Sequence, residues 1–172
     1  MRVTVVAALL SGASVTAVAA AECPITEIEA ALAAPLAGMP MISREVTDIQ
    51  STEGGGWAIY STKLGALHSI VRVDGGESGM SERRLSIVSG EAYGIAVTRV
   101  DYLRHAFIDG AGPNGTAKRT TEYFYFCGGK LLVPPHEYAT LDTAAYAKAG
   151  DEARKAMMED KDVAEFTKDM PR

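Results

Sequence analysis

Between residues 43 and 133, runs rich in valine, isoleucine, threonine and aromatic residues alternate with short connections that contain glycine. Runs of this kind, bounded by turn residues, are typical of β-strands. The expected strands are 44–51, 57–62, 67–74, 80–89, 93–103, 116–127 and 130–133. Most connections are short, whereas a parallel pair needs a crossover of about a dozen residues or more. The sequence therefore predicts an antiparallel meander of five to seven strands.

A helical pattern precedes the predicted sheet. Thr26 and Glu29 match a capping box, in which the two side chains satisfy the free amides of a helix start. Ile28 and Leu32 follow at helical spacing. Pro35 limits this helix to about three turns.

Two further helices are expected from about residue 140. Asp142 is suited to be an N-cap, and Gly150 is suited to end the first of these helices. Asp151 would open the second helix, with a possible break near 160–162. The predicted fold class is α+β, with the C-terminal helices covering one face of the sheet.

Alternation within the strands assigns side chains to faces of the sheet. The expected inner face carries Leu67, Val71, Val73, Leu85, Ile87, Ile95, Val97, Phe124 and Phe126. The opposite phase is polar and includes Arg72, Arg84, Tyr102, Tyr123 and Tyr125. Tyrosine and arginine are enriched in binding hot spots, so these residues are candidates for a recognition surface. The alternatives are that the C-terminal helices lie on this face or that it is simply solvated.

The first 21 residues have the order of a secretory signal peptide. Arg2 is the only charge before Glu22, an apolar run follows it, and Ala19 and Ala21 form an A-x-A cleavage site. Cleavage there would leave residues 22–172 as one domain without a membrane span, and Val18 with Ala20 offers an alternative cut before Ala21. The predicted location is the periplasm or the extracellular space.

The chain has two cysteines, Cys23 and Cys127, and both lie after the predicted cleavage site. An oxidising compartment favours a disulfide between an even pair of this kind. The sequence therefore predicts that the N-terminus is tied to a late strand.

Charge limits the classes of partner. Loss of Arg2 leaves 16 basic and 22 acidic side chains, a net charge of −6. An acidic chain without a basic stripe argues against nucleic acid as a partner. The expected partner is a protein or a cell-envelope component, and no cofactor is expected.

No catalytic or metal-binding motif stands out. His68, His105 and His136 lack metal-binding spacing, and no G-x-S-x-G element is present. The leading prediction is a non-enzymatic binding protein. The alternative from another class is an envelope hydrolase that uses His105 or His68 with a nearby acid.

Two resemblances add to this interpretation. The stretch from Glu53 to Gly79 and the segment from Tyr123 to Gly129 resemble a group of exported Gram-negative β-meander proteins, which implies fold and compartment only. The residues from Ser89 to Tyr93 resemble the S-G-x-x-Y loop of periplasmic inhibitors of C-type lysozyme. That resemblance implies that Ser89 and Tyr93 enter a lysozyme cleft. The cysteine motif here follows the loop, whereas in that family it precedes the loop.

Overall fold

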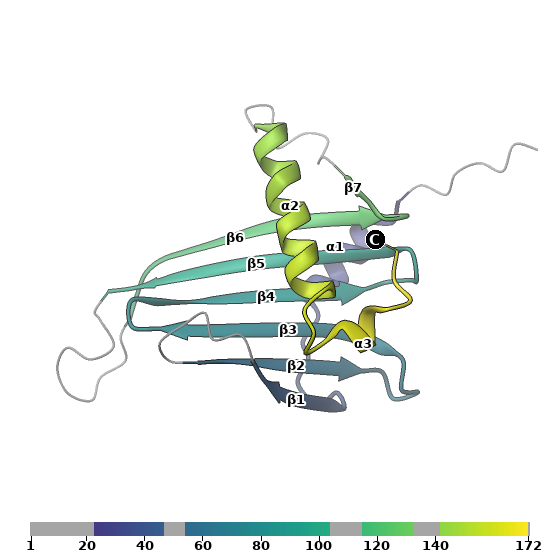
Figure 1. The fold of residues 1–172 in the computed structure, drawn as a ribbon, viewed down its shortest axis with the longest axis horizontal. Helices are drawn as coiled ribbons and strands as arrows, with labels where there is room; N and C mark the ends of the chain where they lie inside the picture. The colour runs from purple at the N-terminus through teal and green to yellow at the C-terminus, as the bar shows by residue number, and fades with distance from the viewer. Residues whose placement is uncertain (1–22, 47–53, 104–114, 133–141, 172) are drawn as a thin grey trace, which may run out of the picture.

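Seven strands form one antiparallel sheet in which each strand pairs with the next along the chain (Figure 1). The computed structural model describes residues 23–46, 54–103, 115–132 and 142–171. The strands are β1 (Met41–Glu45), β2 (Gly55–Ser61), β3 (Leu67–Gly76), β4 (Gly79–Ile87), β5 (Ala92–Tyr102), β6 (Thr116–Cys127) and β7 (Lys130–Leu132). The predicted meander and α+β fold class are confirmed.

Helices cover both faces of this sheet. Figure 1 shows α1 (Ile25–Ala33) behind the sheet, with α2 (Thr143–Met158) and α3 (Ala164–Thr167) across its front. One helix before the sheet and two after it agree with the prediction. The C-terminal helices cover one face, as expected, and α1 covers the other face. The described residues contain no helix that is both long and apolar enough to cross a membrane.

The larger core lies between the sheet and the C-terminal helices. Ile59, Ile70, Leu85, Ile95 and Phe124 stand opposite one another across five strands and are all buried. Met157, Met158 and Val163 close this core from the α2 and α3 side. We call this side of the sheet the α2 face.

The smaller core lies under α1. Ile28 and Leu32 pack there with Ala92 and Tyr125. Gly94 allows this contact, because a Cβ at this position would lie 2.5 Å from Cγ2 of Ile28. We call this side of the sheet the α1 face.

Alternation assigned most inner residues correctly, Leu67 at the start of β3 included, but failed for Val71 and Val73 on the same strand. The α2 face carries Leu85, Ile87, Ile95, Val97, Phe124 and Phe126, as predicted. Val71 pairs with Arg84 on the α1 face, and Arg72 takes the buried position on the α2 face. Polarity could not reveal the phase of β3, because both faces carry helices and the buried arginine is ion-paired.

The predicted capping box of the first helix is wrong. The helix begins at Ile25, so Thr26 lies inside its first turn and makes no cap hydrogen bond. Backbone contacts start the helix instead, because the Ile28 amide donates to the Pro24 carbonyl at 3.0 Å.

The predicted start of the first C-terminal helix at Asp142 is confirmed, but its predicted end at Gly150 and the predicted start of the second helix at Asp151 are wrong. Asp142 accepts hydrogen bonds from the Ala144 and Ala145 amides, as an N-cap does. Gly150 lies within α2, which continues to Met158. The glycine permits close packing here, because a Cβ would lie 2.7 Å from Cδ2 of Leu131.

The predicted disulfide is present. Cys23, just before α1, is bonded to Cys127 at the end of β6, with a Cα–Cα distance of 5.9 Å. The bond joins residues that are 104 positions apart in sequence and fixes the start of α1 beside β6. The predicted signal peptide, residues 1–21, lies outside the described residues.

Candidate binding site

The structure does not assemble the predicted tyrosine and arginine surface. Arg72 lies on the α2 face and is 2% exposed. Arg84, Tyr123 and Tyr125 lie on the α1 face. Tyr102 follows a register shift at the end of β5, where its amide donates to the Ser78 carbonyl at 2.9 Å. A single surface made of these five residues is therefore not formed.

Two of the predicted binding residues anchor α1. The Arg84 guanidinium donates to the carbonyls of Ala31 and Ala34, each at 2.8 Å. These carbonyls belong to the C-terminal end of the helix, where a cation is electrostatically favourable. The Tyr125 hydroxyl donates to Glu29 at 3.2 Å. Both side chains are thus engaged in folding contacts.

The loop that resembles the lysozyme inhibitors keeps its serine exposed but buries its tyrosine. Tyr93 is fully buried and stacks on Phe126 with ring centroids 4.9 Å apart. Its hydroxyl donates to the Pro171 carbonyl at 3.3 Å, and burial raises the pKa of this phenol. The Ser89 hydroxyl accepts a hydrogen bond from the Ala92 amide within the turn. Tyr93 is therefore a core residue in this structure.

His68 is partly buried and contacts a serine that is closed to solvent. Its Nδ1 lies 2.9 Å from the Ser69 hydroxyl, which lies 2.9 Å from the Ser86 hydroxyl. Both serines are completely buried, so neither is placed to attack a dissolved substrate. His105 and His136 lie outside the described residues. Within the described ranges, no three histidine, cysteine, aspartate or glutamate side chains are grouped as metal ligands.

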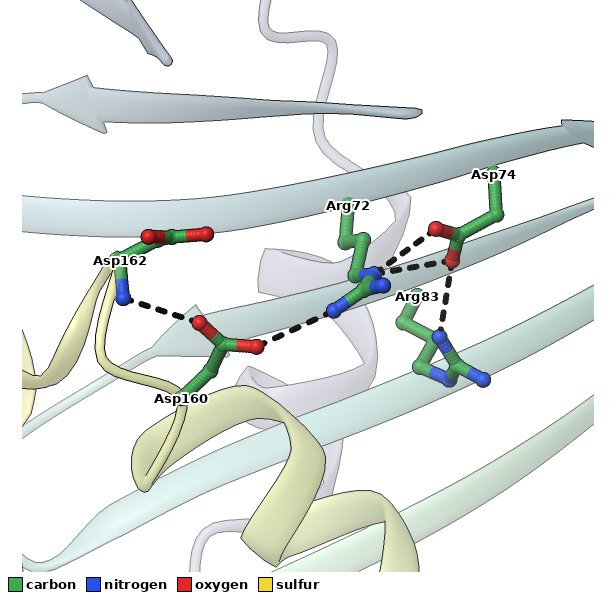
Figure 2. Close-up of polar contacts among 5 residues, drawn as sticks. All are labelled: Arg72, Asp74, Arg83, Asp160 and Asp162. Atoms are coloured by element: carbon green, nitrogen blue, oxygen red, sulfur yellow. Dashed lines mark hydrogen bonds and ion pairs between the residues drawn. The ribbon is translucent and has the colours of Figure 1, made fainter. Parts of the chain in front are cut away.

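An ionic cluster joins the sheet to the turn between α2 and α3 (Figure 2). Arg72 donates to both carboxylate oxygens of Asp74, at 3.0 and 2.9 Å, and to Asp160 at 3.1 Å. Arg83 donates to the same Asp74 carboxylate at 3.0 Å. Asp160 also accepts from the Asp162 amide at 2.9 Å, which fixes the turn.

The two aspartates compensate the positive charges of Arg72 and Arg83. Arg72 and Arg83 stand directly opposite each other on β3 and β4, where like charges repel. Asp74 lies between them and binds both, while Asp160 compensates the remaining positive charge. The ring of Trp57 also lies 5.1 Å from the Arg72 guanidinium carbon. The charges of the two arginines and the two aspartates thus cancel, and the cluster is largely buried. It also holds Arg83 at the edge of the area that α2 covers.

Two hollows adjoin on the α2 face beside this cluster. One, of about 360 Å³, lies at the β3–β4 hairpin, and the other, of about 260 Å³, lies against α2. Arg83 and Arg99 line both of them. We call the two hollows together the polar trough; its charged lining residues are Asp74, Arg83, Arg99, Asp101, Glu122 and Glu152.

The trough offers cationic donors on rigid strands. Ser81 pairs with Arg99 and Arg83 pairs with Val97, so the two arginines are diagonal neighbours on β4 and β5. Arg99 contacts Glu122 at 3.4 Å, and both side chains are more than half exposed. Exposed ion pairs contribute little stability, so a ligand carboxylate can replace this contact at small cost.

Sequence reasoning missed the trough. Arg83 and Arg99 alternate in phase with the apolar residues Leu85 and Val97, and this apolar phase was assigned to the core. The detectable signal was the change from apolar to charged residues along one face of β4 and β5. That change marks the edge of the area of the sheet that α2 covers.

Comparisons with protein-family models, with curated proteins and with solved structures find no significant match to this chain.

Proposed function

We propose that this chain is an exported, non-enzymatic binding protein that holds a protein or cell-envelope component in the polar trough. The observation that carries the proposal is the placement of Arg83 and Arg99 at two adjoining hollows on rigid strands. Concave sites with a few convergent polar groups are the usual setting of ligand binding.

The chemistry of the trough favours a ligand with both carboxylate and hydroxyl or amide groups. Arginine donates in a planar fork that matches a carboxylate. The aspartates and glutamates that line the trough can accept hydrogen bonds from hydroxyl or amide groups. Acidic peptides and acidic glycans of the cell envelope carry such groups.

Export is supported by two independent features. The N-terminal sequence has the order of a secretory signal. The Cys23–Cys127 disulfide is of the kind that persists in an oxidising compartment. We therefore place the binding function in the periplasm or outside the cell.

Affinity capture from an envelope extract tests the proposal. The oxidised protein is immobilised as wild type, as Arg99→Ala and as Arg119→Ala. Arg119 is a matched control, because this arginine of β6 is also exposed but lies on the α1 face, away from the trough. We expect a component that the wild type and Arg119→Ala retain and that Arg99→Ala loses.

Equal retention of the component by all three proteins would refute the assignment of the trough, because it would mean that Arg99 takes no part in binding. Because Arg99 is exposed, its replacement should leave the unfolding transition unchanged, and circular dichroism during thermal unfolding checks this.

A further inference from the structure

The long strand β6 is paired along only part of one side. β7 pairs with residues 125–127, so residues 116–124 face no further strand within the described ranges. The residues from Thr116 to Thr120 are all exposed. An unpaired stretch of this kind presents a row of backbone donors and acceptors that can accept another strand.

The first turns of α2 extend past this edge in Figure 1. Tyr146 of α2 donates to the Tyr123 carbonyl at 2.8 Å, which holds the helix close to the strand and already occupies this one backbone acceptor of the stretch. A hollow of about 350 Å³ lies between them, lined by residues 121–124 of β6 and by Asp142, Ala145, Tyr146 and Ala149 of α2. A strand added to β6 would lie beside this hollow, under the start of the helix.

We propose that the occupant of this edge is the β6 edge of a second copy, paired antiparallel about a two-fold axis at Thr120. Such a contact ends at a dimer, because the same residues of both copies face each other across the two-fold axis. It extends the two sheets into one continuous sheet. The contact shares Glu122 with the lining of the polar trough, but it does not rest on the binding function proposed for the trough.

The charges of β6 are self-complementary in this register. Lys118, Thr120 and Glu122 lie on the same face of the strand. A two-fold axis at Thr120 places each Lys118 opposite the Glu122 of the other copy, and opposite charges across strands attract. An axis at Lys118 or at Glu122 would instead place like charges against each other.

The hollow under α2 supports the same register. Lys118 stands opposite Asp101 on β5, and no ion pair joins them among the described residues, whereas Glu122 and Asp142 both line the hollow. In the proposed dimer the Lys118 of the second copy lies opposite Glu122, which lines this hollow and also contacts Arg99 of its own chain. Its ammonium group thus meets a compensating charge.

Cysteine cross-linking measures the register. The native cysteines are both in the disulfide, so an introduced cysteine provides the only thiol. Thr120→Cys would face its own equivalent in the second copy, whereas Thr116→Cys would lie about 27 Å from its equivalent along the strand. Mild oxidation of the purified protein should yield a covalent dimer of Thr120→Cys at least about tenfold faster than of Thr116→Cys.

Charge variants measure the contact without a covalent bond. Sedimentation of the oxidised wild type should show a concentration-dependent dimer. Lys118→Glu should weaken this dimer about tenfold, because two attractive pairs become repulsive. The exchange of both charges, Lys118→Glu with Glu122→Lys, should restore much of the affinity.

Three results would overturn the proposal. A wild type that stays monomeric at millimolar concentration excludes the contact. Equal cross-linking of the two cysteine variants, or a Lys118→Glu dimer as strong as that of the wild type, places any dimer interface elsewhere. Arg99→Ala changes no residue of the β6 edge, and Thr120→Cys changes no residue that lines the trough, so the two proposals can fail separately.

Discussion

At the residue scale, the shared carboxylate of Asp74 determines whether Arg72 can be buried. Arg72 is 2% exposed and stands opposite Arg83, so its charge must be compensated within the protein. Asp74 binds both guanidinium groups, and Asp160 binds Arg72 from the other side. Removal of one partner from a buried ionic group is far more costly than loss of a surface pair.

We therefore expect Asp74→Asn to lower the free energy of unfolding by about 3 kcal/mol. The amide keeps the shape of the side chain but leaves a net positive charge among buried groups. Urea unfolding followed by tryptophan fluorescence provides the measurement, because Trp57 lies against Arg72. Asp101→Asn is the matched control, since Asp101 is exposed on the same face, and it should change the value by less than about 0.5 kcal/mol. Similar losses in the two variants would contradict this account.

At the scale of elements, glycine determines how closely the helices approach the sheet. Gly94 lies under α1, and a Cβ there would come within 2.5 Å of Ile28 and 2.7 Å of Leu32. Gly150 plays the same part within α2, against Leu131 and Phe124. Both glycines have ordinary backbone angles, so close packing and not a turn accounts for them.

Gly94→Ala should lower the free energy of unfolding by about 2 kcal/mol, because the added methyl group overfills the core under α1. Gly90→Ala is the control: no other heavy atom lies within 4 Å of a Cβ at Gly90, and its backbone angle is ordinary. Thermal unfolding of both variants measures the difference. Equal stabilities would show that α1 shifts freely and that the close approach is not required.

At the scale of the whole molecule, the disulfide links Cys23, just before α1, to Cys127 at the end of β6. Cys23 and Cys127 are 104 positions apart, so the bond closes a loop that includes most of the sheet. Cross-linking of a long loop stabilises a protein mainly by restricting its unfolded chain. The bond also retains α1 over the α1 face, where Ile28 and Leu32 complete the smaller core.

Replacement of both cysteines by serine should lower the free energy of unfolding by about 4 kcal/mol, because the unfolded chain regains the entropy of the open loop. Guanidinium unfolding of the oxidised protein and of the variant gives the difference. The oxidised wild type should also show no free thiol after denaturation without reductant. A titratable thiol in that sample would argue against the bond and against export to an oxidising compartment.

The amino-acid sequence alone determined the meander, the three helices, the disulfide pair and the Asp142 cap. These features depend on local patterns: glycine between alternating runs, helical spacing, an even cysteine pair and a capping residue. Each of them can be recognised without knowing on which face of the sheet a given side chain lies.

Only the tertiary structure decided which face each polar residue occupies and where the candidate site lies. Alternation distinguishes two faces but does not say which is buried, and in this protein helices cover both. Arg72 is buried because Asp74 and Asp160, one of them 88 positions away, neutralise it. The trough depends on where α2 packs on the sheet, because residues of α2 line it together with residues of β4, β5 and β6. Such long-range packing has no local signature, because it depends on residues that only folding brings together.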